Sequence, residues 1–422
     1  MKLFYSFSFV IILVISGTTM DNCQPSTSTN KSAQDILGNP DYQAISFGGY
    51  REQTRDIQPT VEDLKEDMLI LSAMDIKFVR TYHTKLAHAS NVLKAIRELK
   101  NENLNFEMYV MLGAWINCEN AWTDKPNHDG ENAEENSAEV QRAINLTQEY
   151  PDIVKVIAVG NEAMVHWAAS YYVKPRVILK YVNQLQELKK DGDLPADLWI
   201  TSSDNFASWG GGGKEYHNEN LTKLIQAVDY LSVHTYPMHD THYTPAFWGY
   251  RADEENLSKL EKIDVAMLRA KSYAQGQYQN VVNHLKNLNI EKPVHVGETG
   301  WATASNSLYG PDGSGASDEY KEALYYNHIR DWTNEAGISC FYFEAFDEIW
   351  KDANNPGGSE NHFGLFTVDG KAKYVIWDLV DQGKFEGLTR GGNSITKTYG
   401  GDSEAVINDI LDIVPQQLSR EE

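Results

Sequence analysis

Cysteine is scarce in this sequence, with 3 among 422 residues. Cys118 and Cys340 belong to neither a Cys-x-x-Cys motif nor a Cys/His ligand spacing. So few thiols exclude a disulfide framework and offer no zinc-binding pattern. Stability must therefore come from a large hydrophobic core, and about 400 residues can build one as a single barrel or as two smaller domains.

Positive charge is also in short supply, because 37 Lys and Arg face 60 Asp and Glu and leave a formal net charge of −23. A chain this acidic repels nucleic acid and anionic lipid surfaces, so neither is expected as a partner. A neutral substrate is the natural expectation. The 10 Trp and 23 Tyr residues agree with this, since flat aromatic faces pack against sugar rings, although aromatics fill cores more often than they line clefts.

Long apolar runs are absent except at the start of the chain, where Leu3 to Ile15 is broken only by two serines. The run is too short to cross a bilayer and follows Met1-Lys2, so residues 1–22 are predicted to be a signal peptide. Cys23 stands where a lipoprotein signal would end, and residues 23–40, rich in Ser and Thr, would then form a tether. Ordinary cleavage nearby is the alternative. We expect an exported protein, either secreted, periplasmic or a cell-surface lipoprotein, with a lipid on Cys23 as its only membrane anchor.

Short β-rich runs alternate with longer stretches of helical periodicity along most of the chain, which is typical of βα units around a parallel sheet. Most of the runs are continuously apolar, as expected for strands covered on both faces. The expected strands are residues 45–50, 77–82, 106–113, 154–161, 198–204, 230–236, 293–298 and 338–346. The expected helices are residues 61–73, 92–100, 137–149, 176–190 and 257–288, the last of them broken near Gly276.

Eight strands with their crossovers predict a single (β/α)8 TIM barrel over residues 41–385. Residues 386–422 are expected to form a C-terminal extension that packs on the barrel or is partly flexible, with a terminal helix at 403–413. A doubly wound open sheet is the structural rival, but Ser46-Phe47-Gly48-Gly49 is not the Gly-rich turn of such a fold. Trp209 to Gly213 likewise lacks the spacing of a phosphate loop, and we expect a flexible connection there.

Glutamates end two of the expected strands. The fourth ends in Val159-Gly160-Asn161-Glu162 and the seventh in Gly297-Glu298-Thr299-Gly300-Trp301. In such a barrel the C-terminal ends of the strands carry the active site, so the two carboxylates should face each other there. A retaining glycosidase needs two carboxyl groups about 5 to 5.5 Å apart, one protonated and one ionised. Either glutamate alone is more simply a solvated loop carboxylate, but the two together predict a glycosidase pair.

These two motifs resemble the signatures of glycoside hydrolase family 17, the β-1,3-glucanases and related glucanosyltransferases. Further matches are Val79-Arg80-Thr81-Tyr82, Ser232-Val233-His234-Thr235-Tyr236-Pro237, Phe343-Glu344-Ala345-Phe346-Asp347-Glu348 with Lys351, and Ser359-Glu360-Asn361-His362-Phe363-Gly364-Leu365-Phe366. The Thr299-Gly300-Trp301 segment departs from the Ser-Gly-Trp type sequence of the plant enzymes. The eighth-strand motif looks closer to microbial members, some of which are transferases.

The resemblance implies a role for each matched side chain near the scissile bond. Glu162 is implied to be the general acid/base and Glu298 the nucleophile. Asn161 would hydrogen-bond the sugar 2-hydroxyl, Tyr236 would orient Glu298, and Tyr82 would line the same sugar site. For the supporting residues, an ordinary structural ion pair or a core tyrosine is the alternative.

The resemblance also implies a charged network beneath the substrate, formed by Glu344, Glu348 and Lys351. Two tryptophans are singled out by their position in the sequence. Trp301 and Trp350 each directly follow the motif of a strand that carries reacting groups, so we expect them to stack on sugar rings.

No cofactor or metal is expected. His234, His239 and His242 cluster near the sixth strand, but no carboxylate or Cys shares a ligand-like spacing with them. The sequence predicts a monomeric, retaining endo-β-1,3-glucanase that hydrolyses laminarin-like polysaccharides. A β-1,3-glucan glucanosyltransferase that uses the same residues is the alternative. A non-catalytic surface glycan-binding protein is a third hypothesis, and the intact glutamate pair argues against it.

Overall fold

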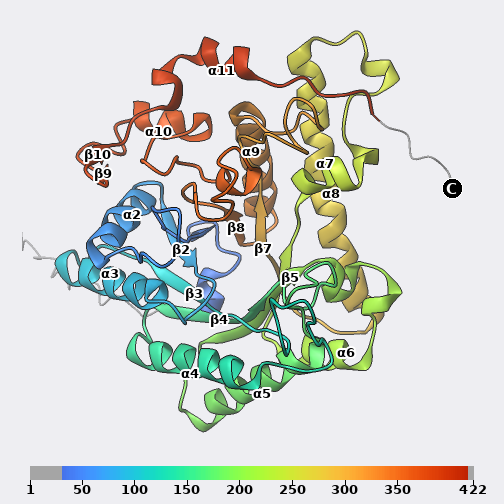
Figure 1. Ribbon diagram of the computed structural model, residues 1–422. Helices are drawn as coiled ribbons and strands as arrows, with labels where there is room; N and C mark the ends of the chain where they lie inside the picture. Colours follow the sequence, from blue (N-terminus) through green and yellow to red (C-terminus); the bar gives the residue numbers. More distant parts are fainter. Residues whose placement is uncertain (1–30, 417–422) are drawn as a thin grey trace, which may run out of the picture. The chain divides into compact units, whose positions relative to one another are not determined.

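Eight parallel strands form a closed barrel at the centre of the computed structural model, which describes residues 31–416 (Figure 1). The strands pair in chain order, and β1 closes the ring by pairing with β8. Each strand overlaps one of the predicted runs, so the predicted (β/α)8 barrel is confirmed. The strands are β1 Gln43–Ser46, β2 Ile76–Arg80, β3 Tyr109–Ala114, β4 Val154–Asn161, β5 Trp199–Asn205, β6 Leu231–His234, β7 Val294–Gly300 and β8 Cys340–Phe343.

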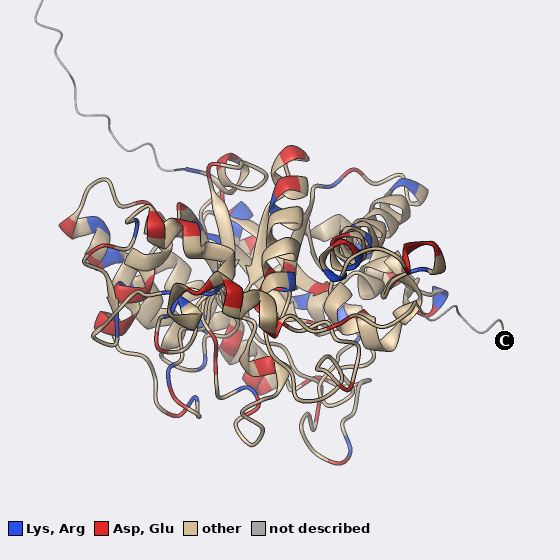
Figure 2. Ribbon diagram, turned by 90° about the horizontal axis from the view of Figure 1, so that it is seen from above, with Lys and Arg blue, Asp and Glu red and all other residues tan. Residues whose placement is uncertain are grey.

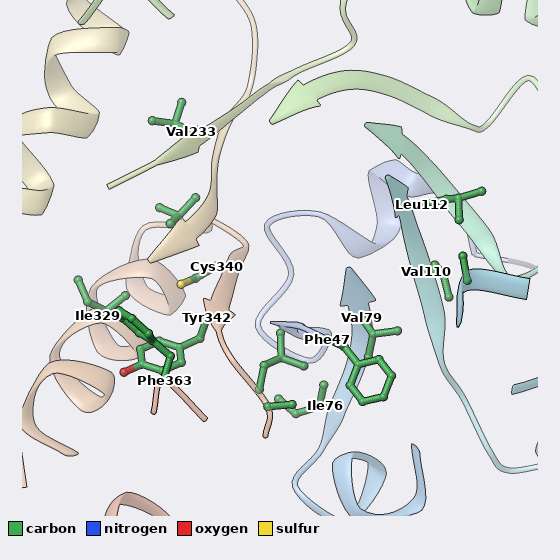
Figure 3. Packing of buried hydrophobic residues seen from close by; sticks show 14 of the residues in the cluster. Phe47, Ile76, Val79, Val110, Leu112, Val233, Ile329, Cys340, Tyr342 and Phe363 are labelled. Carbon is green, nitrogen blue, oxygen red and sulfur yellow. The ribbon is translucent and has the colours of Figure 1, made fainter. Parts of the chain in front are cut away.

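Apolar side chains build these strands because both faces of the sheet are covered. Every residue of β3 is buried, and in β4 only the last, Asn161, is partly exposed. Figure 3 shows Phe47 beside Ile76 and Val79 in this packing. The barrel interior is therefore filled with side chains, and a charged residue within a strand stands out.

The helices form the outer layer and begin at polar residues that cap their free N–H groups. Thr60 before α2 (Val61–Ala73) and Ser258 before α8 (Lys259–Asn287) each form a capping box with an acidic residue three positions on. The other helices between or beside the barrel strands are α1 Ala33–Ile36, α3 His88–Glu102, α4 Ala133–Glu149, α5 Pro175–Asp191, α6 Glu219–Ala227, α7 Pro237–Tyr243, α9 Glu319–Glu335 and α10 Trp377–Asp381.

The predicted break in the long helix is wrong, because α8 runs without interruption past Gly276. Its buried residues include Ile263, Met267 and Val281. Packing of this face outweighs the roughly 1 kcal/mol that glycine costs inside a helix.

The predicted flexible connection at Trp209 to Gly213 is also wrong. Trp209 is fully buried, and its Nε1 donates a hydrogen bond to the carbonyl of Ser232 at 2.9 Å. Gly210 has a φ of +89°, and a Cβ there would lie 2.3 Å from the ring of His284. The glycine-rich stretch is therefore packed closely against α8.

The C-terminal segment is fastened to the barrel by a buried ion pair. It contains β9 (Thr389–Arg390), β10 (Asn393–Ser394) and α11 (Ser403–Asp409). Arg390 is 1% exposed, and its Nε donates to Asp67 Oδ1 of α2 at 2.9 Å. The described part of the predicted extension thus contacts the barrel, and its helix ends at Asp409 rather than at residue 413.

The predicted signal peptide and Cys23 lie outside the described residues. Part of the predicted tether is ordered instead, because Ala33 and Ile36 of α1 are fully buried. Within residues 31–416, no helix is long and apolar enough to cross a membrane. Figure 2 shows the positions of Asp and Glu, in red, on many of the outer helices and loops, in keeping with the net charge of −23.

One buried carboxyl group of the described chain lacks a partner. Glu322 on α9 is fully buried, and neither of its carboxyl oxygens has a hydrogen-bond partner among residues 31–416. Burial raises the pKa of Glu322 well above its ordinary 4.5, against the opposing charge of Lys373. The folded protein therefore keeps this group protonated at pH values where the unfolded chain ionises it.

Glu322→Gln is expected to stabilise the protein at neutral pH. The wild type loses stability as the pH rises above the unfolded-state pKa of about 4.3, because only the unfolded chain then gains by ionising this residue. Glutamine cannot ionise, so the free energy of unfolding should rise near pH 7 by up to about 1.4 kcal/mol for each pKa unit that separates the folded from the unfolded state.

Denaturant unfolding at two pH values measures this gain, which should disappear near pH 4 because the wild-type residue is then neutral in both states. Glu335→Gln at the exposed end of α9 is the control. A loss of stability near pH 7 would contradict the prediction and show that Glu322 contributes as an anion.

Candidate active site

A cleft with a volume of about 1750 Å³ opens at the C-terminal ends of the strands. This is the face on which barrels of this type carry their active sites. Asn161 and Glu162 reach the cleft from the end of β4, Tyr236 from the segment after β6, and Glu298 from β7. The structure thus brings the two predicted glutamates into one cavity.

The backbone turns sharply at the end of β4. Gly160 has a φ of +83° and Glu162 a φ of +44°, both in the left-handed region. A Cβ at position 160 would lie 2.9 Å from the side chain of Ala163, so glycine is required there. The N–H of Glu162 still donates to the carbonyl of Ser203 at 2.9 Å. Strain of this kind persists only where the surroundings enforce it, and it is common at active sites.

Glu298 is held by two neighbours, one on β2 and one in the segment after β6. It is 5% exposed, its Oε1 accepts a hydrogen bond from Arg80 Nη1 at 2.6 Å, and its Oε2 accepts one from the Tyr236 hydroxyl at 2.9 Å. Arg80 lies on β2, and its Nη2 donates to Asn161 Oδ1 at 2.5 Å. These bonds, one of them between opposite charges, fix the orientation of the carboxylate.

A histidine lies between the two glutamates. His234 Nδ1 is 3.0 Å from Glu162 Oε1 and 3.6 Å from Glu298 Oε2. Its Nε2 lies 2.7 Å from Ser203 Oγ. An oxygen of Glu162, a nitrogen of His234 and an oxygen of Glu298 all lie within 4.8 Å of one another. The glutamates are therefore close enough for double displacement, which needs about 5 to 5.5 Å between the carboxyl groups.

The two glutamates differ in protonation. Burial, and then the charge of Glu298, raise the pKa of Glu162 well above its ordinary value. Burial also opposes ionisation of Glu298, but His234, Arg80 and Tyr236 outweigh it and lower the pKa of Glu298. Burial lowers the pKa of His234 to about 4, so near pH 7 the ring is neutral and Arg80 is the cation that keeps Glu298 ionised. One carboxyl group is an acid and its neighbour an anion.

The position of His234 between two carboxyl groups was not expected from residue spacing, and these three side chains could in principle hold a metal ion. Arg80 already binds Glu298 Oε1 at 2.6 Å, and its fixed charge repels a cation. A protonated Glu162 is also a poor ligand, since metals bind the deprotonated form. The set is better suited to proton transfer. His239 contacts the hydroxyl of Tyr309 at 3.0 Å instead.

The sequence profile of the BtgE/BtgC glycoside hydrolase domain matches residues 44–364 of the chain. This protein belongs to the BtgE/BtgC glycoside hydrolase family. Its fold is similar to that of an endo-laminarinase from Formosa Hel1_33_131, with a TM-score of 0.91 and 67% sequence identity over 93% of this chain and 100% of the other.

Two more distant proteins are also similar to this chain. A glucan 1,3-beta-glucosidase of Arthroderma benhamiae is 26% identical over 275 residues, which are 63% of this chain and 70% of the relative. A glycoside hydrolase family 17 beta-1,3-glucanosyltransferase from Rhizomucor miehei shares the fold, with a TM-score of 0.54 and 20% identity over 79% of this chain and 96% of the other. The alignments with two other curated relatives cover 41% and 45% of the length of those relatives.

In this glycoside hydrolase, Asn161, Tyr82 and Tyr236 line the cleft together with the glutamates. Arg80 occupies the amide oxygen of Asn161, which leaves the NH2 group to donate to a ligand. The hydroxyl of Tyr82 is buried and has no hydrogen-bond partner within residues 31–416. Tyr236 contacts Glu298 directly, as the family resemblance implies.

The predicted charged network is present at the end of β8. Lys351 Nζ lies 2.6 Å from Glu344 Oε1 and 3.1 Å from Glu348 Oε2. Burial opposes the charge of Lys351, but these carboxylates outweigh it and raise its pKa. Glu348 and Lys351 line the cleft, whereas Glu344 is 1% exposed and holds Lys351 from behind.

The two predicted stacking tryptophans lie in different environments. Trp350 is half-buried and lines the cleft, but the guanidinium of Arg55 covers one face of its ring at 4.2 Å. A sugar can therefore stack only on the opposite face unless Arg55 moves.

The stacking role predicted for Trp301 is contradicted by its burial. Trp301 is 0% exposed, its Nε1 donates to the carbonyl of Ala316 at 2.7 Å, and its ring packs against Trp248 and Tyr325. Because β7 extends to Gly300, the next side chain turns into the layer between strand and helix rather than into the cleft. Trp301 is a core residue.

Arg80 and His234 are functional residues that the sequence prediction did not assign to the site. Both stand within matched motifs, and each is a charged or titratable side chain at the end of a buried strand. That position was the available signal, since a buried charge in a barrel strand needs a partner.

Proposed function

We propose that this protein is a retaining endo-β-1,3-glucanase of glycoside hydrolase family 17 that hydrolyses laminarin-like glucans. The observation that carries the proposal is the pairing of Glu162 and Glu298, which lie close together with opposite protonation. The 67% identity with an endo-laminarinase supports a β-1,3-glucan as the substrate. The matched motifs and the fold shared with a family 17 enzyme support the family assignment.

In the first step, a carboxylate oxygen of Glu298 attacks the anomeric carbon of the sugar. The bond from that carbon to the leaving oxygen breaks, and Glu162 transfers its proton to this oxygen. Arg80 and Tyr236 hold Glu298 in one orientation for the attack. The products are a glycosyl ester on Glu298 and a shortened glucan chain.

In the second step, water replaces the leaving sugar. The charge on Glu298 is now lost in the ester, so the charge that helped to raise the pKa of Glu162 is gone. Glu162 is therefore ready to accept a proton from water, whose oxygen attacks the anomeric carbon and releases Glu298. Two displacements on one carbon restore the original β configuration.

The cleft suits a long neutral polymer. Exposed aromatic rings stand on its wall: Trp122 is 62% exposed and Trp167 is 63% exposed. Exposed apolar surface within a groove often marks a ligand-binding site. Chains of β-1,3-linked glucose offer the flat, uncharged faces that such rings pack against.

Digestion of linear and branched β-1,3-glucans, with products sized over time, tests the proposal. We expect a spread of intermediate oligosaccharides at early times and a β-configured reducing end in the first product seen by NMR. Products longer than the starting oligosaccharide would show glucanosyl transfer instead. Release of glucose alone, or a first product in the α configuration, would contradict the proposal.

A further inference from the structure

The cleft continues from the catalytic pair to the segments that follow β6 and β7. The ring of His239 contacts Tyr236 at a centroid distance of 5.2 Å, and its Nδ1 is 3.0 Å from the hydroxyl of Tyr309. The next residue on α7, Asp240, lines the same cleft together with Gln277 of α8. These two polar side chains have no part in the chemistry described above.

Gln277 has an unsatisfied acceptor on the wall of the cleft. The residue is 5% exposed, and its Nε2 donates to Asp240 Oδ2 at 3.0 Å. Its Oε1 is buried and has no hydrogen-bond partner in the described part of the chain. Buried polar atoms without hydrogen-bond partners are uncommon, and each one needs an explanation, such as a bound ligand.

An aromatic surface lies beside this acceptor. Tyr243, at the end of α7, is 67% exposed and lines the cleft. Tyr273 lies on α8, and its ring stacks on that of Phe247 with centroids 4.2 Å apart. The wall thus combines an exposed aromatic ring with a hydrogen-bonded polar pair.

The polar groups of the lining residues Asp240 and Gln277 include hydrogen-bond acceptors. Asp240 is a carboxylate, and the free atom of Gln277 is a carbonyl oxygen, so a matching ligand must supply donors. Sugar hydroxyl groups do so without bringing charge. A metal ion fits poorly, because Glu162, His234 and Glu298 are the only three-residue group within residues 31–416 whose ligand atoms converge.

We propose that Asp240, Gln277 and Tyr243 form a distal subsite that binds one glucosyl unit of a long glucan chain. The inference rests on the proposed function and adds residues that determine which glucan lengths the enzyme prefers. Only a chain long enough to reach this subsite gains its hydrogen bonds and stacking. The enzyme should therefore favour long chains and cut them internally.

Gln277→Met tests the subsite, because methionine fills a similar volume but has no carbonyl acceptor. The measurement is kcat/KM for laminari-oligosaccharides of increasing length. We expect the ratio of kcat/KM for laminariheptaose to that for the shortest cleaved substrate to fall about tenfold, the effect of one lost hydrogen bond. Tyr243→Ala, at an exposed position that does not threaten the fold, should lower the same ratio.

Gln279→Met is the matched control, since this glutamine lies on the exposed side of α8 and bonds only Asn283. Equal losses at all chain lengths with a lower Tm would show a structural role for Gln277 and overturn the proposal. An unchanged ratio in both variants would overturn it as well.

A binding measurement tests this inference separately from the proposed function. Laminariheptaose is titrated calorimetrically into Glu298→Gln and into the same variant with Gln277→Met added. Weaker binding by the double variant supports the subsite, and equal binding overturns it. If the wild type cleaves no β-1,3-glucan, the proposed function fails, and the titration still decides the subsite.

Discussion

Glu298→Gln should reduce turnover of laminarin and of activated aryl glucosides alike, by roughly 10,000-fold or more. The amide cannot form the glycosyl ester, so a better leaving group gives no help. Turnover by Glu298→Asp should also be strongly impaired. Aspartate keeps a negative charge beside Arg80, but its shorter side chain places the carboxylate oxygen farther from the anomeric carbon. The measurement is the initial rate on both substrates at saturating concentration.

The aspartate variant is the control for a folding defect. The glutamine variant leaves the buried Arg80 without its anion, whereas the aspartate variant retains one. Azide added to Glu298→Ala should restore turnover of an activated substrate and give an α-azide, because only one displacement then occurs. Activity of Glu298→Gln near the wild-type level would show that another group is the nucleophile.

Glu162→Gln should lose activity on laminarin but still form a glycosyl-enzyme from an activated aryl glucoside. A nitrophenolate departs without a proton, whereas a sugar does not. The variant should then stall, because no general base remains to activate water. Azide needs no base and should restore turnover with a β-azide product. Product configuration by NMR and burst kinetics with an aryl substrate measure both effects.

The same assignment predicts a pH profile. Burial and Glu298 raise the pKa of Glu162, so the wild type should keep its acid, and its activity, well above the ordinary pKa of a glutamate. Activity should fall on the alkaline side as Glu162 ionises and on the acid side as Glu298 is protonated, at a pH below its ordinary pKa. In azide-rescued Glu162→Gln the alkaline fall should be lost. An α-azide product from this variant would mean that the two glutamates have exchanged roles.

Much of the barrel could be predicted because its signals are local. Continuous apolar runs indicate strands covered on both faces, and a capping residue such as Thr60 indicates where a helix begins. Helix continuity at Gly276 could not be predicted in this way, because contacts made by the rest of α8 outweigh the local cost of one glycine.

The sequence by itself determined the chemistry of the site. Glu162 directly follows strand four, and Glu298 lies near the end of strand seven. Parallel strands in a barrel bring their C-terminal ends to one mouth, so strand order alone places the two carboxyl groups together.

Only the tertiary structure decided how side chains next to these strands are used. Trp301 follows Glu298 by three positions but turns into the core, while Arg80 and His234, far away in sequence, contact the two glutamates. Gln277 and Asp240 meet only because α8 and α7 pack together at the cleft. The physical reason is that side-chain direction and protonation depend on packing and burial by distant elements, which strand order does not contain.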